Sequence, residues 1–385
     1  MKVLVYGLAR SGRSAAKRLV ERGDEVVVAD RTLGNEADLS LLDGVELLVK
    51  NPGIPGERPL VVIARERGIP VWSEVELGYG LLPASHFVGV TGTNGKTTTV
   101  ELLGAIFRAA GRDVAVAGNV GTPLTSVRAA EWVVCELSSF QLEDVHALAC
   151  DVAVLLNLEP DHLDRHGTFE AYRDAKLRIF ERARVSIVPR GSGLGGIEFS
   201  RDDALPAEPL LRGAHNRENA AAATAAARAA GVGDEAIAEA LRTFPGVPHR
   251  LELVAERAGV RYVNDSKATN VAAARPALEA YADDPVHLIL GGSLKGESFA
   301  PLADAIGDNV ESIHVIGESA EALAQVLPSA LRDETLERAV HHAARLAQPG
   351  DVVLLSPACA SFDQFENFEQ RGEAFRAIVE ALPDD

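Results

Sequence analysis

The stretch HFVGVTGTNGKTTT at residues 86–99 decides the fold of this chain. An apolar, β-branched run breaks into a turn containing Gly92 and Gly95, and VELLGAIFRAAG at residues 100–111 then has apolar residues at helical spacing. This order predicts a strand, a phosphate-binding loop and a helix. Glycines let backbone N–H groups surround a polyphosphate, Lys96 places a charge at its outer end, and a threonine hydroxyl can ligate Mg²⁺. The stretch therefore predicts a nucleotide site.

The loop departs from the full Walker spacing, which would place glycine at position 90, where this chain has Val90. A Gly-Asn turn that merely joins a strand to a helix is the alternative interpretation. That alternative does not explain why Lys-Thr-Thr stands at the start of the helix. We therefore expect the loop to bind ATP or GTP.

Composition limits the remaining classes of function. A chain of 385 residues with 47% hydrophobic and 24% charged residues is typical of a globular protein of two or three domains. The formal net charge of −18 disfavours nucleic acids and anionic membranes as partners. Any anionic substrate must therefore be bound by local lysines, arginines and helix N-termini.

The three cysteines, Cys135, Cys150 and Cys359, lie far apart, which argues against both a zinc site and a disulfide framework. A reducing cytoplasm is the simplest location. The opening MKVLVYGLARSG predicts a strand and a turn rather than a signal peptide, and no segment has the apolar length that a membrane span needs.

Residues 1–83 predict a first domain of the doubly wound type. KVLVYG leads into a turn between Gly7 and Gly12, a helix follows, and the strand DEVVVAD ends in Asp30. A dinucleotide fingerprint would have glycine at position 9, where this chain has Ala9. Binding of NAD, binding of another nucleotide's phosphate or ribose, and a purely structural turn all stay open at this point.

Residues 84–246 predict a second domain of further strand-and-helix units, with polar loops at the strand ends. Glu136 directly follows the strand WVVC and is either a Mg²⁺ ligand or a capping or solvated carboxylate. His162, after NLEP, is either a metal ligand or part of a polar loop. On its own, Lys176 reads as one solvated charge of an amphipathic helix.

Residues 247–385 predict a third domain, in which two strands joined by a tight Ala258-Gly259 turn form a hairpin before the polar stretch NDSKATN, and the strands VHLILGG, SIHVIG and DVVLLSPACA follow. NDSKATN alone is also compatible with a simple polar turn. SPACASFDQFENFEQRGEAF is compatible with a strand and an amphipathic helix whose core residues are Phe362, Phe365, Phe368 and Phe375. The predicted class is α/β, with three consecutive domains: a Rossmann-like N-terminal domain, a P-loop-type central ATPase and a Rossmann-like C-terminal domain.

Six segments together resemble the Mur ligase family: VTGTNGKTTT, ELSSFQLE, NLEPDHLDRHG with AKLRIF, PHRLELV, NDSKATN and SPACASFDQFENFEQRGEAF. The match covers all three predicted domains. NDSKATN and the last segment resemble the members that add D-glutamate. GTNGKTT alone would also fit folylpolyglutamate synthetases.

The resemblance implies an ATP-dependent amide ligase of peptidoglycan precursor synthesis. ATP would phosphorylate the alanyl carboxylate of UDP-N-acetylmuramoyl-L-alanine, and the amine of D-glutamate would then attack the acyl phosphate. The implied cofactors are two Mg²⁺ ions and a carbamylated Lys176. We expect a monomer in the cytoplasm.

The resemblance also assigns residues to roles. Those implied as catalytic are Lys96, Glu136, His162 and Lys176. The first magnesium site would use Thr97 and Glu136 with Ser138 nearby, and the second His162 and Lys176. The residues implied for ATP are Gly92, Thr93, Asn94, Gly95, Lys96, Thr97, Thr98, Asn119, Asn216, Asn219, Arg250 and Asp265. Those implied for D-glutamate are Lys267, Thr269, Lys295, Ser361, Phe362 and Phe368, and those for the UDP end are Arg10, Ser11, Asp30, Arg31 and Thr32.

Two other functions compete with this one. A folylpolyglutamate synthetase would share the central domain, but such chains begin near the phosphate loop and would have no counterpart of residues 1–83. A nucleotide-sensing protein with an inactive loop is the alternative that is not an enzyme. The joint presence of Lys96, Glu136, His162 and Lys176 argues against it.

Overall fold

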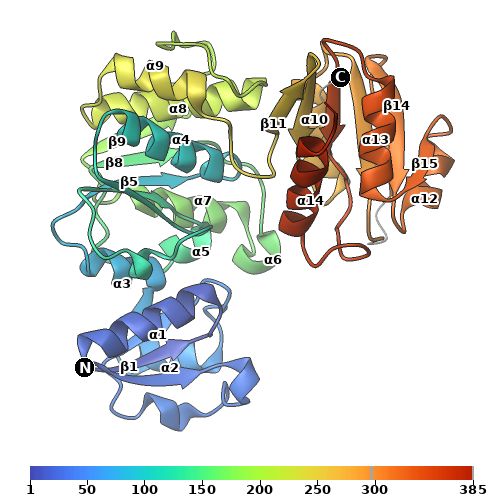
Figure 1. Ribbon diagram of the computed structural model, residues 1–385. Helices are drawn as coiled ribbons and strands as arrows, with labels where there is room; N and C mark the ends of the chain where they lie inside the picture. Colours follow the sequence, from blue (N-terminus) through green and yellow to red (C-terminus); the bar gives the residue numbers. More distant parts are fainter. Residues whose placement is uncertain (295–297, 384–385) are drawn as a thin grey trace. The chain divides into compact units, whose positions relative to one another are not determined.

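The computed structural model describes residues 1–294 and 298–383 (Figure 1). The chain divides into two compact units, which are described separately. Unit 1 comprises Met1–Pro209 with Glu218–Thr243, and unit 2 comprises Leu210–Arg217 with Phe244–Asp385. Unit 1 holds two β-sheets and unit 2 holds one, which confirms the predicted α/β class and gives one sheet for each of the three predicted domains. The exact domain boundaries stay a prediction.

The first sheet of unit 1 has the strand order β2-β1-β3-β4, and its strands are parallel. Val3 and Val5 pack toward α1, whereas Leu4 and Tyr6 pack toward α2, as the alternation of side chains along a strand requires. The elements are β1 (Lys2–Tyr6), α1 (Arg10–Arg22), β2 (Glu25–Ala29), β3 (Leu47–Lys50), α2 (Pro59–Glu66), β4 (Val71–Ser73) and α3 (Glu74–Gly80), with short 3₁₀ turns at Arg31–Leu33 and Leu39–Leu42.

The second sheet of unit 1 is also parallel and has the order β10-β9-β8-β5-β7-β6. Strand β5 lies between β7 and β8, so the chain changes direction across the sheet at the strand that precedes the phosphate loop. Figure 1 shows α4, α8 and α9 on one face of this sheet and α5 and α7 on the other. An open α/β sheet binds its ligands at such a switch point, beyond the carboxyl ends of the strands.

The elements of this second layer are β5 (His86–Thr91), α4 (Lys96–Ala109), β6 (Val114–Gly118), β7 (Trp132–Glu136), α5 (Ser139–Leu142), β8 (Val152–Leu155), α6 (Leu163–His166), α7 (Phe169–Leu177), β9 (Val185–Pro189), β10 (Ile197–Phe199), α8 (Ala214–Ala229) and α9 (Asp234–Thr243), with 3₁₀ turns at Leu124–Ser126 and Arg178–Phe180.

The sheet of unit 2 has the order β11-β12-β16-β13-β14-β15. Only the pair of β11 and β12 is antiparallel within the described residues, and it is closed by a turn in which Ala258 and Gly259 both have positive φ. This confirms the predicted hairpin. Apolar side chains of α10 and α12 pack on one face of the sheet, and those of α13 and α14 pack on the other.

The elements of unit 2 are β11 (Glu252–Arg257), β12 (Val260–Asn264), α10 (Val271–Ala280), β13 (Val286–Gly291), α11 (Ala300–Ala303), β14 (Val310–Ile316), α12 (Ala320–Val326), β15 (Leu331–Glu334), α13 (Leu336–Leu346), β16 (Val352–Leu355) and α14 (Phe368–Glu380). Across the part of the chain that the structure describes, no helix has both the length and the apolar character needed to cross a bilayer.

The elements around the first sheet of unit 1 contact those around its second sheet at a buried carboxyl group. Glu74, the first residue of α3, is fully buried, and its Oε1 accepts the backbone N–H of Thr125 at 2.7 Å. The Thr125 hydroxyl lies 2.6 Å from the same oxygen and 2.7 Å from the Ser14 hydroxyl of α1. Burial raises the pKa of Glu74 to about 7, although the two Thr125 donors oppose the rise. The contact between the layers therefore contains an acid that is largely protonated below neutrality.

We predict that Glu74 makes unit 1 less stable as the pH rises. Because the folded state holds this proton up to about pH 7 and an unfolded glutamate releases it near pH 4.5, the folded state binds more protons between these two pH values. The free energy of unfolding should fall over that window by at most about 3 kcal/mol. Glu74→Gln should remove this slope in chemical denaturation between pH 5 and 8, and an unchanged slope would contradict the assignment.

Candidate active site

The phosphate loop lies between β5 and α4, as the sequence predicts. Gly92 has φ +155° and Gly95 has φ +81°, and Gly95 is the N-cap of α4. A side chain at Gly95 would place its Cβ 2.2 Å from Oδ1 of the buried Asn219. Glycine is therefore required there both by the backbone conformation and by the Asn219 side chain that lies against the loop.

Two residues beyond the end of β8 hold the loop from the other side. Asn157 accepts the backbone N–H of Asn94 with its Oδ1 at 2.8 Å, and its carbonyl accepts the N–H of Thr93 at 3.1 Å. Glu159 accepts the Asn94 side-chain amide at 3.1 Å. The sequence analysis did not identify Asn157 or Glu159, although both lie in the NLEP segment that it quoted. Their hydrogen bonds constrain the conformation of the loop.

Two lysines converge on one carbonyl of the loop. Lys96 Nζ donates to the carbonyl oxygens of Gly92 and Thr93, both at 2.8 Å. Lys176 Nζ, from α7, donates to the same Gly92 oxygen at 2.7 Å. Lys176 is only 2% exposed, so the interpretation of this residue as a solvated helix charge is wrong. Burial, followed by the charge of Lys96, lowers the pKa of Lys176 to about 7 against the opposing charges of Asp161 and Glu136.

Glu136 ends β7 and is buried, and its Oε1 accepts the Asn119 side-chain amide at 3.0 Å. The adjacent helix α5 is capped by Ser138, which forms a capping box with Gln141. Helix α5 is therefore capped by Ser138 and not by Glu136, for which a capping role was one alternative. Thr97 lies in the first turn of α4 and is half-buried. An acid at a strand end beside a phosphate loop is the arrangement that the sequence predicts for a Mg²⁺ ligand.

His162 is exposed and has φ +52° at the start of α6, with its ring centroid 4.8 Å from that of Phe140. His166 is more buried than His162. Its ring stacks on that of Phe140, with centroids 5.2 Å apart, and meets the ring of Tyr172 edge-on, with centroids 5.3 Å apart. Lys176 Nζ lies 4.8 Å from the centroid of the Tyr172 ring. His166 and Tyr172 were missed by the sequence analysis, which had no signal that α6 and α7 form one wall beside the loop.

The candidate UDP residues gather at the turn between β1 and α1 and at the end of β2. Asp30 accepts the N–H of Leu8 at 2.5 Å, and Thr32 donates both its N–H at 2.8 Å and its hydroxyl at 2.6 Å to the other Asp30 oxygen. These bonds, that of the Thr32 hydroxyl first, lower the pKa of Asp30 to about 2. Arg10 begins α1, and the side chains of Arg10, Arg31 and Thr32 are exposed. Asp30 therefore shapes the turn itself.

In unit 2, the candidate residues follow the carboxyl ends of β12 and β16. Asp265 is 5% exposed and accepts the Ser356 hydroxyl at 2.8 Å and the Leu251 N–H at 3.3 Å. Burial raises the pKa of Asp265 to about 7, because these two hydrogen bonds only partly compensate. Lys267 Nζ lies 5.9 Å from the ring centroid of Phe368, the first residue of α14.

Arg371 of α14 is the main connector of these loops and was not identified from the sequence. Its guanidinium is buried and donates to the Ser266 hydroxyl at 2.9 Å and the Ser266 carbonyl at 2.8 Å. It also donates to the carbonyls of Cys359 at 3.0 Å, Ala360 at 3.2 Å and Gly291 at 3.4 Å. One side chain thus ties together the loops that follow β12, β13 and β16.

The remaining predicted residues of unit 2 differ in exposure. Asn216 and Ser361 are buried, whereas Arg250 and Thr269 are half-buried. Phe362 is 70% exposed and Phe375 fully buried, so the core interpretation is right for Phe375 and wrong for Phe362. Lys295 lies outside the described residues. The roles of these residues stay predictions.

The Mur ligase middle domain matches residues 90–195, and the Mur ligase glutamate ligase domain matches residues 249–359. A UDP-N-acetylmuramoylalanine–D-glutamate ligase of Acidobacterium capsulatum is 41% identical, with 98% of this chain and 96% of the relative covered. The enzyme of the same name from Geobacillus kaustophilus is 40% identical, with 99% of this chain and 98% of the relative covered.

Solved structures share the fold. A UDP-N-acetylmuramate-alanine ligase from Thermotoga maritima has a TM-score of 0.62 at 18% identity. The match covers 99% of this chain and 99% of that structure. A bifunctional folylpolyglutamate synthase/dihydrofolate synthase from Yersinia pestis, complexed with AMPPNP and a Mn ion, has a TM-score of 0.57 at 20% identity. It covers 79% of this chain and 92% of its own length.

We predict that Arg371→Lys destabilises unit 2. A lysine keeps the charge but replaces a planar fork of five donors with three, so two or more of the carbonyl contacts are lost. At about 1 kcal/mol for each hydrogen bond, the free energy of unfolding should fall by about 2 kcal/mol in urea denaturation. Arg338→Lys is the matched control, because Arg338 forms an exposed ion pair with Glu334 and its replacement should cost less than about 0.5 kcal/mol. Equal effects of both changes would refute the role of Arg371.

Proposed function

The chain belongs to the Mur ligase family, and we propose that it joins D-glutamate to UDP-N-acetylmuramoyl-L-alanine at the expense of ATP, in peptidoglycan precursor synthesis. The observation that carries this proposal is identity of about 40% over nearly the whole chain to ligases named for that reaction. The two-lysine phosphate loop supplies independent support, because it provides the positive charge that phosphoryl transfer requires.

The reaction has two steps. The alanyl carboxylate attacks the γ-phosphorus of ATP, so that a C–O–P bond forms and the bond to ADP breaks. The amine of D-glutamate then attacks the acyl phosphate, and the tetrahedral intermediate collapses to the amide with loss of inorganic phosphate and a proton. The protein's part in such chemistry is to position the groups and neutralise charge.

Lys96 and the N-terminus of α4 act on the phosphates. The loop Gly92–Thr98 presents backbone N–H groups where the helix dipole favours negative charge. Lys96 Nζ rests on the Gly92 and Thr93 carbonyls, which places its charge over the loop. We assign Asn119, Asn216, Asn219, Arg250 and Asp265 to the rest of ATP, following the family resemblance.

The residues near the loop fit a hard divalent cation. Thr97 and Glu136 would hold one Mg²⁺, because a hydroxyl and a buried carboxylate are oxygen ligands of the kind that Mg²⁺ prefers. His162 and Lys176 would hold a second. Bound Mg²⁺ would neutralise the charge of the transferred phosphoryl group.

Lys176 fits that second position only after a covalent change. An ammonium group repels a cation, but a neutral lysine amine adds to carbon dioxide to form an N–C bond, giving a carbamate and releasing one proton. The carbamate supplies oxygen ligands. The buried position of Lys176 and the charge of Lys96 lower its pKa to about 7, which provides the neutral amine at physiological pH.

The two organic substrates are assigned by resemblance. Arg10, Ser11, Asp30, Arg31 and Thr32 would receive the UDP end, and the exposed Arg10 and Arg31 supply charges suited to a diphosphate. Lys267, Thr269, Lys295, Ser361, Phe362 and Phe368 would receive D-glutamate, whose two carboxylates require cations.

The deciding experiment measures phosphate release from ATP in the presence of UDP-N-acetylmuramoyl-L-alanine and, in separate reactions, D-glutamate, L-glutamate or a folate. We expect turnover only with D-glutamate. Lys96→Ala should abolish it, since the charge stabilising the transferred phosphoryl group is worth several kcal/mol in a water-excluded site, about 10²-fold in rate or more. Activity with folate instead would support a folylpolyglutamate synthetase, and nucleotide binding without turnover would support a sensor.

We predict that Lys176→Ala is nearly inactive and that acetate or formate partly restores its turnover, by supplying the missing carboxylate. Lys176→Arg should not be rescued, because the arginine cation cannot form a carbamate and its side chain fills the space that acetate or formate would occupy. Lys17→Ala, at an exposed lysine of α1, is the matched control and should retain activity. Labelling with ¹³C-bicarbonate should give a carbamate NMR signal in the parent protein and not in Lys176→Ala. A fully active Lys176→Arg enzyme would refute the carbamate.

A further inference from the structure

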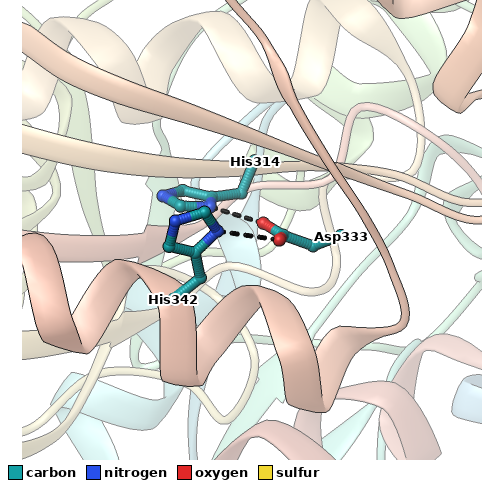
Figure 2. Close-up of side chains that lie close together, drawn as sticks. All are labelled: His314, Asp333 and His342. Carbon is teal, nitrogen blue, oxygen red and sulfur yellow. Dashed lines mark hydrogen bonds and ion pairs between the residues drawn. The ribbon is translucent and has the colours of Figure 1, made fainter.

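Unit 2 contains a compact cluster of two histidines and an aspartate, which come from β14, β15 and α13 at the edge of its sheet. Figure 2 shows His314, Asp333 and His342 converging, with each imidazole directed at one oxygen of the carboxylate. His314 Nδ1 lies 2.6 Å from Asp333 Oδ2, and His342 Nδ1 lies 2.9 Å from Asp333 Oδ1. One donor atom from each residue lies within 4.8 Å of the other two.

The backbone of β15 is distorted at the point where it directs Asp333 into this cluster. The pairing of β14 with β15 shifts register there, because Val315 pairs with Arg332 and Ile316 pairs with Glu334. Asp333 is therefore the extra residue of a β-bulge, and the following Glu334 has φ +64°. Bulges redirect side chains and are frequent next to functional sites. Asp333 is consequently buried, although aspartate is rarely found in the interior.

A second layer of hydrogen bonds holds the His314 ring. Its Nε2 lies 2.8 Å from the Ser312 hydroxyl, which lies 2.7 Å from His287 Nδ1. His287 Nε2 in turn lies 3.1 Å from Asp351 Oδ2. Metal-binding histidines characteristically use the second ring nitrogen in this way, as an N–H donor to an oriented oxygen.

The chain of contacts from Asp351 to Asp333 is one hydrogen short with neutral rings, and either an added proton on one ring or a metal ion at His314 Nδ1 removes this shortage. The four contacts that run from Asp351 through His287, Ser312 and His314 to Asp333 require four hydrogens, whereas two neutral imidazoles and one hydroxyl supply three. If a metal ion occupies His314 Nδ1, only three of these contacts need a hydrogen. His314 then donates to Ser312, Ser312 donates to His287, and His287 donates to Asp351, so every polar atom of the chain is satisfied with neutral rings.

We propose that His314, Asp333 and His342 form a binding site for a divalent transition-metal ion, Zn²⁺ being the best fit. Two imidazole nitrogens and one carboxylate oxygen are ligands of the type found in three-ligand zinc sites. Magnesium is excluded as the preferred ion because it takes mainly oxygen ligands. The proposal is independent of the ligase function.

Metal binding requires the three side chains to adjust. Metal–donor distances of about 2.0–2.1 Å in a tetrahedron correspond to donor–donor distances of about 3.3 Å, so the two contacts to Asp333 must lengthen by roughly half an ångström. The two histidine nitrogens, which lie within 4.8 Å of each other, must also come to about 3.3 Å. The His342 side chain is 31% exposed, which leaves it room to move and leaves the fourth position open to water. The arginine beside Asp333 does not oppose a cation, because Arg332 pairs with Glu321 at 2.7 Å.

Cobalt supplies a spectroscopic test with the whole protein. In excess Mg²⁺ and without nucleotide, Co²⁺ should bind one equivalent and give the visible absorption bands of a tetrahedral site, and Zn²⁺ should remove them. His342→Ala and Asp333→Asn should lose these bands. His341→Ala is the matched control, because this neighbour on α13 does not belong to the cluster, and it should keep them. Ser312→Ala should weaken binding by about 10- to 100-fold through loss of the second layer.

Stability gives a second readout. Zn²⁺ should raise the thermal midpoint of the parent protein and of His341→Ala, since it would tie α13 to β14 and β15, and should leave His342→Ala unchanged. Circular dichroism checks that each variant is folded, and His342→Gln replaces His342→Ala if that variant is not. Failure of the folded parent protein to bind Co²⁺, or equal binding by the parent and a folded His342 variant, would show that the cluster is a hydrogen-bonded triad only.

Discussion

The Gly92 carbonyl oxygen is the point on which the catalytic half of unit 1 depends. It accepts hydrogen bonds from Lys96 and from Lys176, which come from helices on different parts of the sheet. Two ammonium groups at one oxygen repel each other, and burial together with the charge of Lys96 lowers the pKa of Lys176 to about 7. Backbone geometry and burial alone thus place a lysine with a lowered pKa against the loop.

Holding two lysines at one carbonyl oxygen requires a rigid loop. Gly95 is confined by its positive φ and by Asn219, and the loop is bonded on its far side to Asn157 and Glu159. These contacts are made by the protein's own side chains, and they hold the loop in a defined shape. Preorganised donors cost no reorganisation at the moment of reaction, which is why electrostatic stabilisation is effective in such sites.

The sequence predicts features that are local and misses those that depend on tertiary contact. The strand, loop and helix at residues 86–109 and the hairpin of β11 and β12 follow from short-range spacing, and both are confirmed. Strand β15 was missed because LRDE has no apolar run, and it forms at the sheet edge where β14 supplies its partners. Arg371 was missed because a single arginine in a helix is normally a solvent-exposed charge. Only the fold shows that the loops after three strands contact its guanidinium.

Asp30 and Asp265 show why a pattern of residues does not determine chemistry. Each acid directly follows an apolar strand. Asp30 is only partly buried and accepts three hydrogen bonds, which lower its pKa to about 2, so it is a fixed anion that orders its own turn. Asp265 is almost fully buried with two hydrogen bonds, and its pKa rises to about 7. A buried acid with so few donors is stabilised as an anion only when a further donor reaches it, and a ligand hydroxyl would be such a donor. The balance between burial and the number of donors therefore separates an acid that is held as an anion from one whose pKa lies near neutrality.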